Sequence, residues 1–285
     1  MSQKQKIIAA LHRADIGGAP VDFRSLLARL AESELLLPRM DAEAFSDTNL
    51  MRYWNWAQQE NDAHVRRGCL PLLRAVSATA RAISSPIHAM ISSHDPGQQE
   101  IGKLAVSRPK LLRAIDALTD REYEALACVA CSAVGSKINV LTRRGNEGGI
   151  DFFASISASS GAHIFAAPGA ELRVVGQCKK YSSQATVGQM DQFIQTLQNV
   201  RHRSSRVLAH IPAWFGDSRG PIVGWMISHA GFQTGASDQA KNHGIVTSDS
   251  LDVAEVLSLS PSFHSSLPPD GRASKVADEC GLLLR

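Results

Sequence analysis

The chain has 285 residues, of which 44% are hydrophobic and 20% charged, and its formal net charge is +3. These values are ordinary for globular proteins, and they exclude wholesale disorder, a collagen-like repeat and a small disulfide-knotted protein. A chain of this length is expected to form about two domains. The small net charge does not by itself indicate a nucleic-acid-binding protein, and an aromatic content of 6% argues against a surface built for base stacking.

Cysteine usage and hydropathy predict a cytoplasmic protein that has no membrane anchor. The five cysteines are an odd number, and the apolar run from Ile7 to Leu11 is too short for a secretion signal. No stretch approaches the roughly 18 apolar residues that a membrane-spanning helix needs. We therefore expect reduced, free thiols.

The first part of the chain has the residue spacing of helices. Apolar residues recur at helical intervals in four segments, 7–11, 23–30, 50–56 and 72–83. This pattern predicts a helical N-terminal domain of unknown role over 1–105, followed by a linker with a short helix over 106–118.

From residue 119 onward, helix and strand patterns alternate, which favours an α/β architecture. Thr119 and Glu122 have the spacing of a capping box, and the helix that they open should end at Gly135. Strands are expected at 138–142, 150–156, 163–166, 172–179, 222–227 and 244–247, and helices at 187–200, 234–242 and 251–257. The last segment, 258–285, is rich in Ser and Pro, and we expect a loosely ordered tail there.

The most informative feature is a glycine-rich loop that ends in an acid at the start of an apolar strand. This acid is Asp151, and a later strand ends in Gln177-Cys178-Lys179. Because side chains alternate along a strand, Gln177 and Lys179 point to one face and Cys178 to the other. If the two strands pair as a hairpin, Asp151, Gln177 and Lys179 converge. A carboxylate, an amide and an amine at a sheet end suit metal-dependent hydrolysis of a phosphodiester, because the carboxylate holds a hard cation and the amine can orient water.

At these residues the sequence resembles the Mrr-type branch of the PD-(D/E)xK nucleases, the type IV restriction endonucleases, over 119–257. The matching motifs are Tyr123-Glu124-Ala125-Leu126, Gly148-Gly149-Ile150-Asp151, Gln177-Cys178-Lys179-Lys180-Tyr181, Val187-Gly188 with Asp191 and Phe193, and His229-Ala230-Gly231-Phe232. The resemblance implies an α/β fold with a restriction-endonuclease-like mixed central sheet flanked by helices. Members of the family often carry a winged-helix DNA-binding domain before the nuclease domain. Residues 1–105 show no β-wing, so we do not expect one here.

The resemblance also implies a site for Mg²⁺, with Mn²⁺ as the alternative ion. Asp151 would be the principal ligand and the main-chain carbonyl of Cys178 a second one. Gln177 stands where related nucleases have Glu or Asp, and Glu124 would restore the missing carboxylate. Lys179 would be the catalytic lysine.

The distribution of charge agrees with a DNA substrate. Between residues 172 and 206, six basic residues stand against one acid, Asp191. We expect contacts to DNA phosphates from Arg143, Arg144, Lys180, Arg201 and Arg203. The chain between the helix that ends near Val200 and the strand at Ile222 is longer than the family usually has, and the segment 207–216 within it predicts an inserted loop or an extra strand.

Simpler interpretations stand beside these assignments. Asp151 could be the cap of a turn and nothing more, Lys179 could protect an edge strand from aggregation, and Glu124 could be a solvated helix residue. Cys128 and Cys131 have C-x-x-C spacing, but they share one helix with no second pair, so we expect buried core thiols there.

The leading hypothesis is therefore a Mg²⁺-dependent DNA endonuclease that acts in restriction or anti-phage defence. One alternative is a structure-specific nuclease for junctions or flaps. Another is a non-catalytic module on a nuclease fold that binds DNA or a partner protein, and the uncharged Gln177 keeps this alternative open. The N-terminal helices could join the chain to a partner protein or to a second copy.

Overall fold

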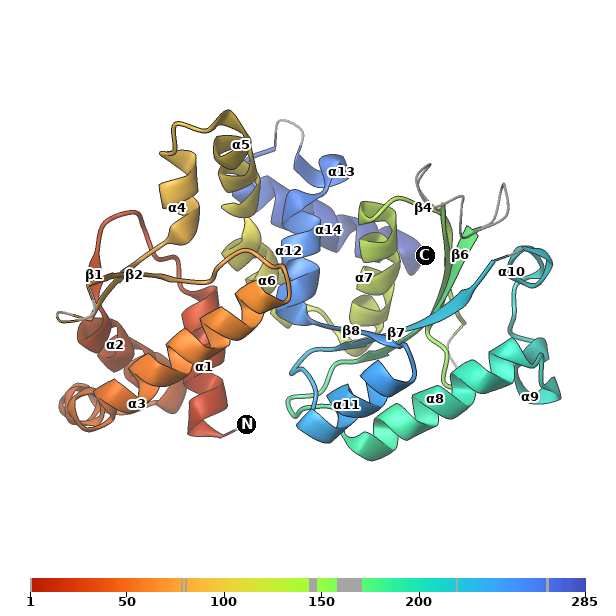
Figure 1. Cartoon of the computed structure of the whole chain (residues 1–285), viewed down its shortest axis with the longest axis horizontal. Helices are drawn as coiled ribbons and strands as arrows, with labels where there is room; N and C mark the ends of the chain where they lie inside the picture. The colour runs from red at the N-terminus through yellow and green to blue at the C-terminus, as the bar shows by residue number, and fades with distance from the viewer. Residues whose placement is uncertain are drawn as a thin grey trace. The chain divides into compact units, whose positions relative to one another are not determined.

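The computed structural model describes residues 2–77, 79, 81–143, 148–157, 171–218, 220–264 and 267–285. The chain divides into two compact units, residues 1–113 and 114–285, and each is described by itself (Figure 1). The division lies inside the segment where a linker with a short helix was expected, and that helix is α6 (Arg108–Ala117). None of the helices in the described part of the chain is both long enough and apolar enough to cross a membrane.

The N-terminal unit is mainly helical and contains one small sheet. Its elements are α1 (Gln3–Arg13), β1 (Val21–Asp22), α2 (Phe23–Leu35), α3 (Arg39–Arg66), β2 (Arg74–Ser77), β3 (Ala82–Ser84), α4 (Pro86–Ile91), α5 (Pro96–Ala105) and the first part of α6. Strand β3 lies between β1 and β2 and pairs antiparallel with both. This order of helices and strands is that of a winged helix, in which α2 and α3 form the helix-turn-helix and β2–β3 the wing.

The expectations of a helix over 72–83 and of no β-wing are therefore wrong. The alanine-rich segment favours a helix by local propensity, but it forms the β2–β3 hairpin. Ile83 is fully buried and lies opposite Val21 on β1 and Ala75 on β2. Pairing with β1, which is distant in sequence, outweighs the local preference because it buries Ile83 in the core.

The core of the N-terminal unit is formed by α1, α2, α3 and the small sheet. Phe23 of α2 and Trp54 of α3 meet edge to face, with their ring centroids 5.4 Å apart. Leu27 and Ile83 are fully buried in the same cluster. One face of α3 therefore belongs to the core, and its opposite face is exposed.

The C-terminal unit is built on a five-stranded mixed sheet. Its elements are α7 (Asp120–Ala133), β4 (Ser136–Leu141), β5 (Phe152–Ser157), β6 (Glu171–Lys179), α8 (Val187–Arg201), α9 (Ser205–Leu208), α10 (Ala213–Asp217), β7 (Ile222–Ser228), α11 (Thr234–Asn242), β8 (Val246–Asp249), α12 (Ser250–Leu259), α13 (Pro261–His264) and α14 (Pro269–Leu283). The strand order is β4-β5-β6-β7-β8, antiparallel from β4 to β6 and parallel from β6 to β8. The predicted mixed sheet flanked by helices is confirmed. The strand expected at 163–166 lies outside the described residues.

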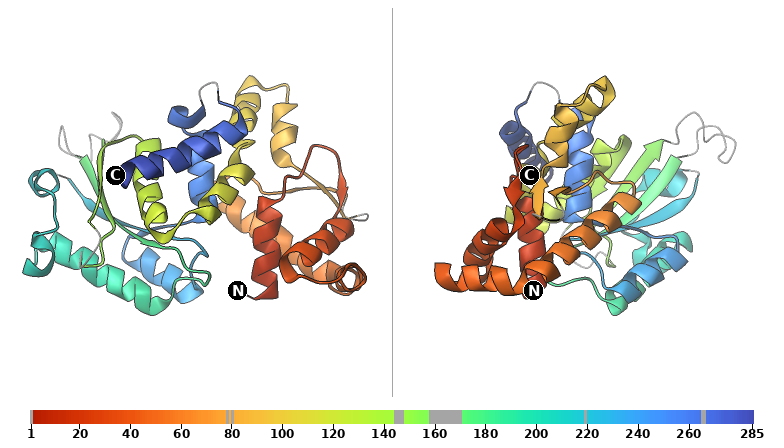
Figure 2. Two further views of the ribbon diagram at one scale, coloured as in Figure 1. Left: turned by 180° about the vertical axis from the view of Figure 1, so that it is seen from behind. Right: turned by 60° about the vertical axis from the view of Figure 1, so that its left-hand side comes forward.

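Helices cover both faces of this sheet. Helices α7, α12 and α14 lie on one side, and α8 and α11 lie on the other (Figures 1 and 2). The capping box predicted for α7 is present, since the Thr119 N–H donates to Glu122 Oε2 at 2.7 Å and the Glu122 N–H to Thr119 Oγ1 at 3.3 Å. Gly135, with φ of 86°, follows the end of this helix as expected.

Two segments of this unit differ from the sequence expectations. Residues 258–285 are not a loose tail in the described part, because α14 packs against α7 and buries Val276 and Cys280. The segment 207–216 forms no extra strand, and the two short helices α9 and α10 occupy it. Phe215 of α10 is buried against Phe153 of β5, with ring centroids 4.8 Å apart, so the insertion adds to the core.

Candidate functional site

Asp151 lies at the start of β5, against the end of β6. Its N–H donates to the Gly176 carbonyl at 2.9 Å, and its Oδ2 accepts a hydrogen bond from the Cys178 N–H at 2.6 Å. The Thr142 N–H donates to the Asp151 carbonyl at 2.9 Å, which ties the same residue to the end of β4. The position of the carboxylate is therefore set by three strands.

Gln177 shares this end of the sheet with Asp151. The register places Phe152 opposite Gly176, so the residues next to them, Asp151 and Gln177, face each other across β5 and β6. Gln177 is only 7% exposed, and its Nε2 donates to the Gly149 carbonyl at 2.9 Å. Its Oε1 is buried and accepts no hydrogen bond from any described residue. A buried acceptor of this kind costs about 1–3 kcal/mol unless a partner fills it.

The glycine turn before Asp151 is fastened to α8. Gly148 and Gly149 have positive φ values of 65° and 84°, a conformation that side chains disfavour. Thr196 of α8 donates its hydroxyl hydrogen to the Gly148 carbonyl at 3.0 Å, and a Cβ on Gly149 would lie 3.2 Å from the Thr196 Oγ1. Sequence reasoning missed Thr196, and the only available signal was a hydroxyl on the otherwise apolar face of a helix.

Lys179 follows on the same strand face as Gln177, as the alternation of β6 requires. The side chain is half-buried, and its Nζ lies 6.0 Å from the centre of the Tyr181 ring. The Lys179 carbonyl accepts a hydrogen bond from the His229 N–H at 2.9 Å. Pairing with β7 thus holds the main chain of Lys179, which is the last residue of β6.

The Cys178 side chain lies on the opposite face of the sheet, towards α7. Burial raises the pKa of its thiol well above the ordinary value, and the negative charge of Asp151 raises it next. Cys128 and Cys131 of α7 are also fully buried, and burial likewise raises the pKa of both thiols. These groups are core thiols, as expected, and the part of Cys178 that belongs to the candidate site is its main chain.

Glu124 approaches from α7 but is already paired. Arg121, three residues earlier, donates to the Glu124 carboxylate and to the Thr142 carbonyl. This arginine links the glutamate to the residue that holds Asp151. Among the described residues, neither Glu124 nor Asp151 belongs to a group of three His, Cys, Asp or Glu side chains close enough to share a metal ion. Asp151 is thus the carboxylate aligned with Gln177 and the Cys178 main chain.

Three of the basic residues expected on DNA donate hydrogen bonds to main-chain carbonyls of neighbouring helices and strands. Arg201 donates to the Ile222 carbonyl at 2.9 Å, Lys180 to the Asp116 carbonyl at 2.9 Å, and Arg203 to the Gly216 carbonyl. Arg173 likewise donates to two carbonyls of the segment that carries α10, those of Phe215 and Gly220. Arg143 is exposed, and Arg144 lies outside the described residues. Most of the basic residues that make this part of the sequence positive therefore stabilise the fold through hydrogen bonds to the main chain.

A histidine–aspartate pair also lies near the end of these strands. His229, which follows β7, bonds through Nε2 to Asp116 Oδ1 at 2.8 Å and meets the Tyr123 ring edge to face. Sequence reasoning did not single out this pair, since 113 positions separate its two members.

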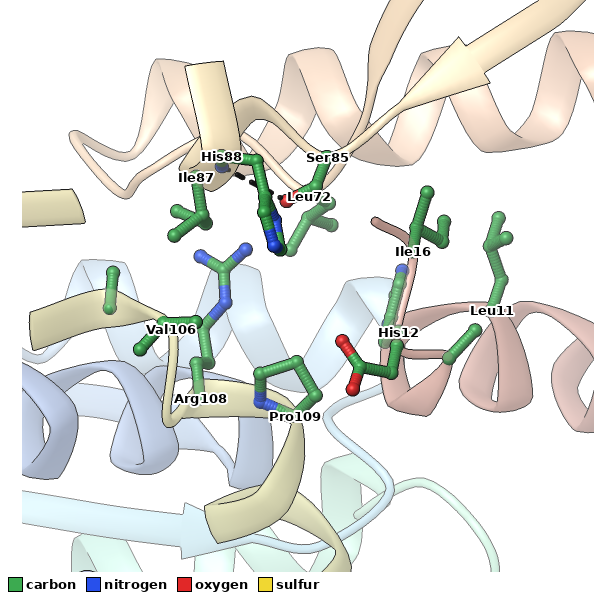
Figure 3. A pocket seen from close by; sticks show the side chains of 13 residues that line it. Leu11, His12, Ile16, Leu72, Ser85, Ile87, His88, Val106, Arg108 and Pro109 are labelled. Atoms are coloured by element: carbon green, nitrogen blue, oxygen red, sulfur yellow. Dashed lines mark hydrogen bonds between the residues drawn. The ribbon is translucent and has the colours of Figure 1, made fainter. Parts of the chain in front are cut away.

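The N-terminal unit holds a small polar cavity of about 30 Å³ (Figure 3). His12, His88 and Arg108 line it together with apolar side chains. Burial, and then the nearby His64 and Arg108, lower the pKa of His12 to about 3, so this imidazole is neutral. The volume admits one or two water molecules and no substrate.

The donors at the end of β5 and β6 fit a hard divalent cation. Mg²⁺ and Mn²⁺ prefer oxygen ligands, and the Asp151 carboxylate and the Gln177 Oε1 are both oxygen donors at one strand end. The Gln177 Oε1 is the decisive atom, because it is buried and its hydrogen-bonding capacity is unused within the described structure.

Comparisons with known proteins concern the family of the chain and do not address the individual residues of this site. The family model Mrr_cat, described as a restriction endonuclease, matches residues 115–257, which is half of the chain. A search of curated proteins found no significant match.

Three solved structures overlap with the chain in part. The restriction endonuclease MspJI in complex with a 27-mer oligonucleotide is 18% identical, with 66% of this chain and 40% of that chain covered and a TM-score of 0.37. For the DNA modification-dependent restriction endonuclease AspBHI the identity is 14%, the coverage 62% and 40%, and the TM-score 0.41. For the restriction endonuclease FokI these values are 11%, 91%, 45% and 0.37. The chain spans less than half the length of each, and TM-scores below 0.5 support no conclusion about this chain.

Proposed function

Since the chain belongs to the restriction endonuclease family that Mrr_cat describes, we propose that it is a Mg²⁺-dependent DNA endonuclease of the cytoplasm. Mn²⁺ would replace Mg²⁺ at the same oxygen donors. The observation that carries the proposal is the strand end where Asp151 faces Gln177 and the amide oxygen of Gln177 has no partner among the described residues. The biological role would be restriction or defence against foreign DNA.

The chain's own residues have distinct tasks in this proposal. Asp151, the Gln177 Oε1 and the Cys178 carbonyl would hold the cation, and Glu124 would join them if it left Arg121. The bound cation would offset the charge that develops on the phosphate and lower the pKa of a water molecule. Lys179, at the end of the same strand, would orient the attacking water and offset negative charge in the transition state.

The positive charge of the N-terminal unit also supports DNA as the partner. Residues 1–113 contain 15 Lys and Arg against 11 Asp and Glu, whereas residues 114–285 contain 15 against 16. The positive excess of the chain thus belongs to the unit that has winged-helix connectivity. Because phosphate contacts supply most of the general affinity for DNA, we assign DNA binding to this unit as well as to Arg143 and the other predicted residues of the nuclease unit.

One observation favours a second candidate, a non-catalytic DNA-binding module. Gln177 brings no charge and Glu124 is paired with Arg121, so of the predicted ligands Asp151 alone would supply negative charge to a cation. A metal site with a single carboxylate binds its ion more weakly than one with two. DNA binding without metal-dependent cleavage of any substrate would favour this candidate.

The test is incubation of the purified chain with plasmid DNA and Mg²⁺ or Mn²⁺, beside Asp151→Ala and Lys179→Ala. We expect the parent to cut and both variants to lose cutting by at least about a hundredfold. Lys241→Ala, an exposed lysine on α11, is the matched control and should cut like the parent. If all variants cut equally, the site assignment is wrong. Branched, methylated and plain duplexes tested side by side separate a structure-specific nuclease from a restriction enzyme.

A further inference from the structure

The outer face of helix α3 has the composition of a surface that reads bases. Thr48, Met51, Arg52, Asn55 and Gln59 are all exposed. At 100° per residue they form one stripe, which is here named the α3 stripe. Arginine and the amides of Asn and Gln make paired hydrogen bonds to base edges in the major groove, and methyl-bearing side chains contact thymine.

The α3 stripe lies directly opposite the face of α3 that belongs to the core. Tyr53, Trp54 and Ala57 are buried and point the other way around the helix. The stripe therefore contributes little to the fold of the unit. An exposed row of one threonine, one methionine, one arginine and two amides on a long helix is consistent with a contact to another molecule.

The part of the sequence that contains the stripe has no acidic residues. No Asp or Glu occurs from residue 48 to 59, and none occurs from 63 to 94. Acids crowd the start of α3, at Asp41, Glu43 and Asp47, and return only at Glu60 and Asp62. The second acid-free stretch contains the whole wing. The stripe from Thr48 to Gln59 and the wing thus carry no carboxylate of their own, and the exposed Asp41 and Asp62 lie on the same helix face just beyond the two ends of the stripe.

The wing is joined to the stripe by a direct contact. Arg81, next to the start of β3, has a φ of 48°, which is unusual for a residue other than glycine, and its Nε lies 3.0 Å from the Met51 sulfur. Arg74 is exposed on β2. Arg52 lies 6.0 Å from the Trp56 ring centre, and Lys4 of α1 lies 4.8 Å from it. Basic groups therefore flank the stripe on both of its long sides.

The connection before α3 has the length that a helix-turn-helix needs. Three residues, 36–38, separate α2 from α3, and the first of them, Leu36, adopts a left-handed conformation with φ of 56°. In such units the second helix enters the major groove, while flanking groups contact the phosphates. This placement would bring the α3 stripe to the base edges and the wing arginines to the backbone.

We infer that the α3 stripe determines the DNA sequence that this protein selects, with Asn55 and Gln59 reading base edges and Arg74 and Arg81 holding phosphates. The inference rests on the proposed function only in taking duplex DNA as the ligand. Recognition by the stripe does not need the metal site, so the two can be tested apart.

The experiment measures binding of the full chain in EDTA, where no metal-dependent cleavage occurs. Sites are first selected from a library of random duplexes, and the affinity for a selected site is then compared with that for random DNA. In the double variant Asn55→Ala/Gln59→Ala we expect this ratio to fall by about tenfold or more, since each lost amide contact removes a paired hydrogen bond. In Arg74→Ala/Arg81→Ala we expect weaker binding to every sequence at an unchanged ratio, and a salt dependence that is shallower by about one unit per arginine.

The matched control is Gln3→Ala/Gln98→Ala, which removes two exposed amides from other helices of the same unit. It should bind like the parent. An unchanged ratio in the Asn55/Gln59 variant, or a parent that binds no duplex in EDTA, would overturn the inference. Neither result touches the nuclease proposal, which depends on cleavage by the parent and its loss in Asp151→Ala.

Discussion

Replacing Gln177 with methionine separates the stability of the site from its function. Methionine has nearly the same length and volume, so the packing at this 7% exposed position is retained. The substitution removes the hydrogen bond from Nε2 to the Gly149 carbonyl, and it also removes the buried Oε1 that has no partner among the described residues.

The two losses change the free energy of unfolding in opposite directions. Losing the bond to Gly149 costs about 1 kcal/mol, and water can replace the donor because Gly149 is exposed. Removing a buried, unpaired acceptor contributes about 1–3 kcal/mol of stability. In the absence of metal, the free energy of unfolding should therefore stay constant or rise by up to about 2 kcal/mol.

The assay is chemical denaturation in EDTA, followed by thermal unfolding with and without Mg²⁺ or Mn²⁺. A ligand that binds only the folded state raises its stability, so the cations should raise the melting temperature of the parent and leave that of Gln177→Met unchanged. DNA cleavage should be lost in the variant. Gln192→Met, an exposed glutamine on α8, is the control and should behave like the parent in all three measurements.

Two outcomes would refute this reasoning. If Gln177→Met unfolds in EDTA more easily than the parent by over about 2 kcal/mol, the amide oxygen must have a partner in the folded protein. If the cations stabilise the variant as much as the parent, Gln177 is not part of the metal site.

Three further predictions concern the sheet, the N-terminal unit and the glycine turn. A Cβ at Gly176 would lie 1.9 Å from the buried Phe152 ring, so Gly176→Ala should destabilise the chain by about 3 kcal/mol or more, whereas Gly188→Ala, in open space on α8, should be neutral or stabilising in the same denaturation assay. The pKa of His12 is lowered from 6.5 to about 3, so the unfolded state binds more protons below pH 6.5. The free energy of unfolding should therefore fall by about 2 kcal/mol between pH 7.5 and pH 5, and this fall should be absent in His12→Asn; an equal slope in both proteins would contradict the assignment. Thr196→Val removes the hydroxyl that holds the glycine turn before the candidate site, so cleavage should slow by about tenfold with DNA affinity in EDTA unchanged; an unchanged rate would show that the turn holds its shape without this bond.

Local features of the sequence predicted most of the C-terminal unit. Some features depend only on residues that are neighbours in the chain, namely the capping box at Thr119, the helix end at Gly135 and the alternation along β6. Interactions within a few positions are enough to determine them. The opposition of Asp151 and Gln177 followed from one hairpin, which is the simplest long-range pairing. These features, together with the ordered motifs of the resemblance, were enough to identify the family and to name the residues of the strand end.

Contacts between distant residues decided the rest. The segment 72–83 is a wing and not a helix because β1 pairs with it. The C-terminal segment is ordered because α14 packs on α7 and buries Cys280 there. Arg201 and Arg203 donate to carbonyls of β7 and α10, and the sequence does not reveal that these elements lie within their reach. The unpaired oxygen of Gln177 is a property of its surroundings, since whether a polar atom is satisfied depends on every group that folding brings near it. Composition and spacing therefore determined which chemical groups this protein carries, and tertiary structure determined which of them are already engaged and which are left to bind something else.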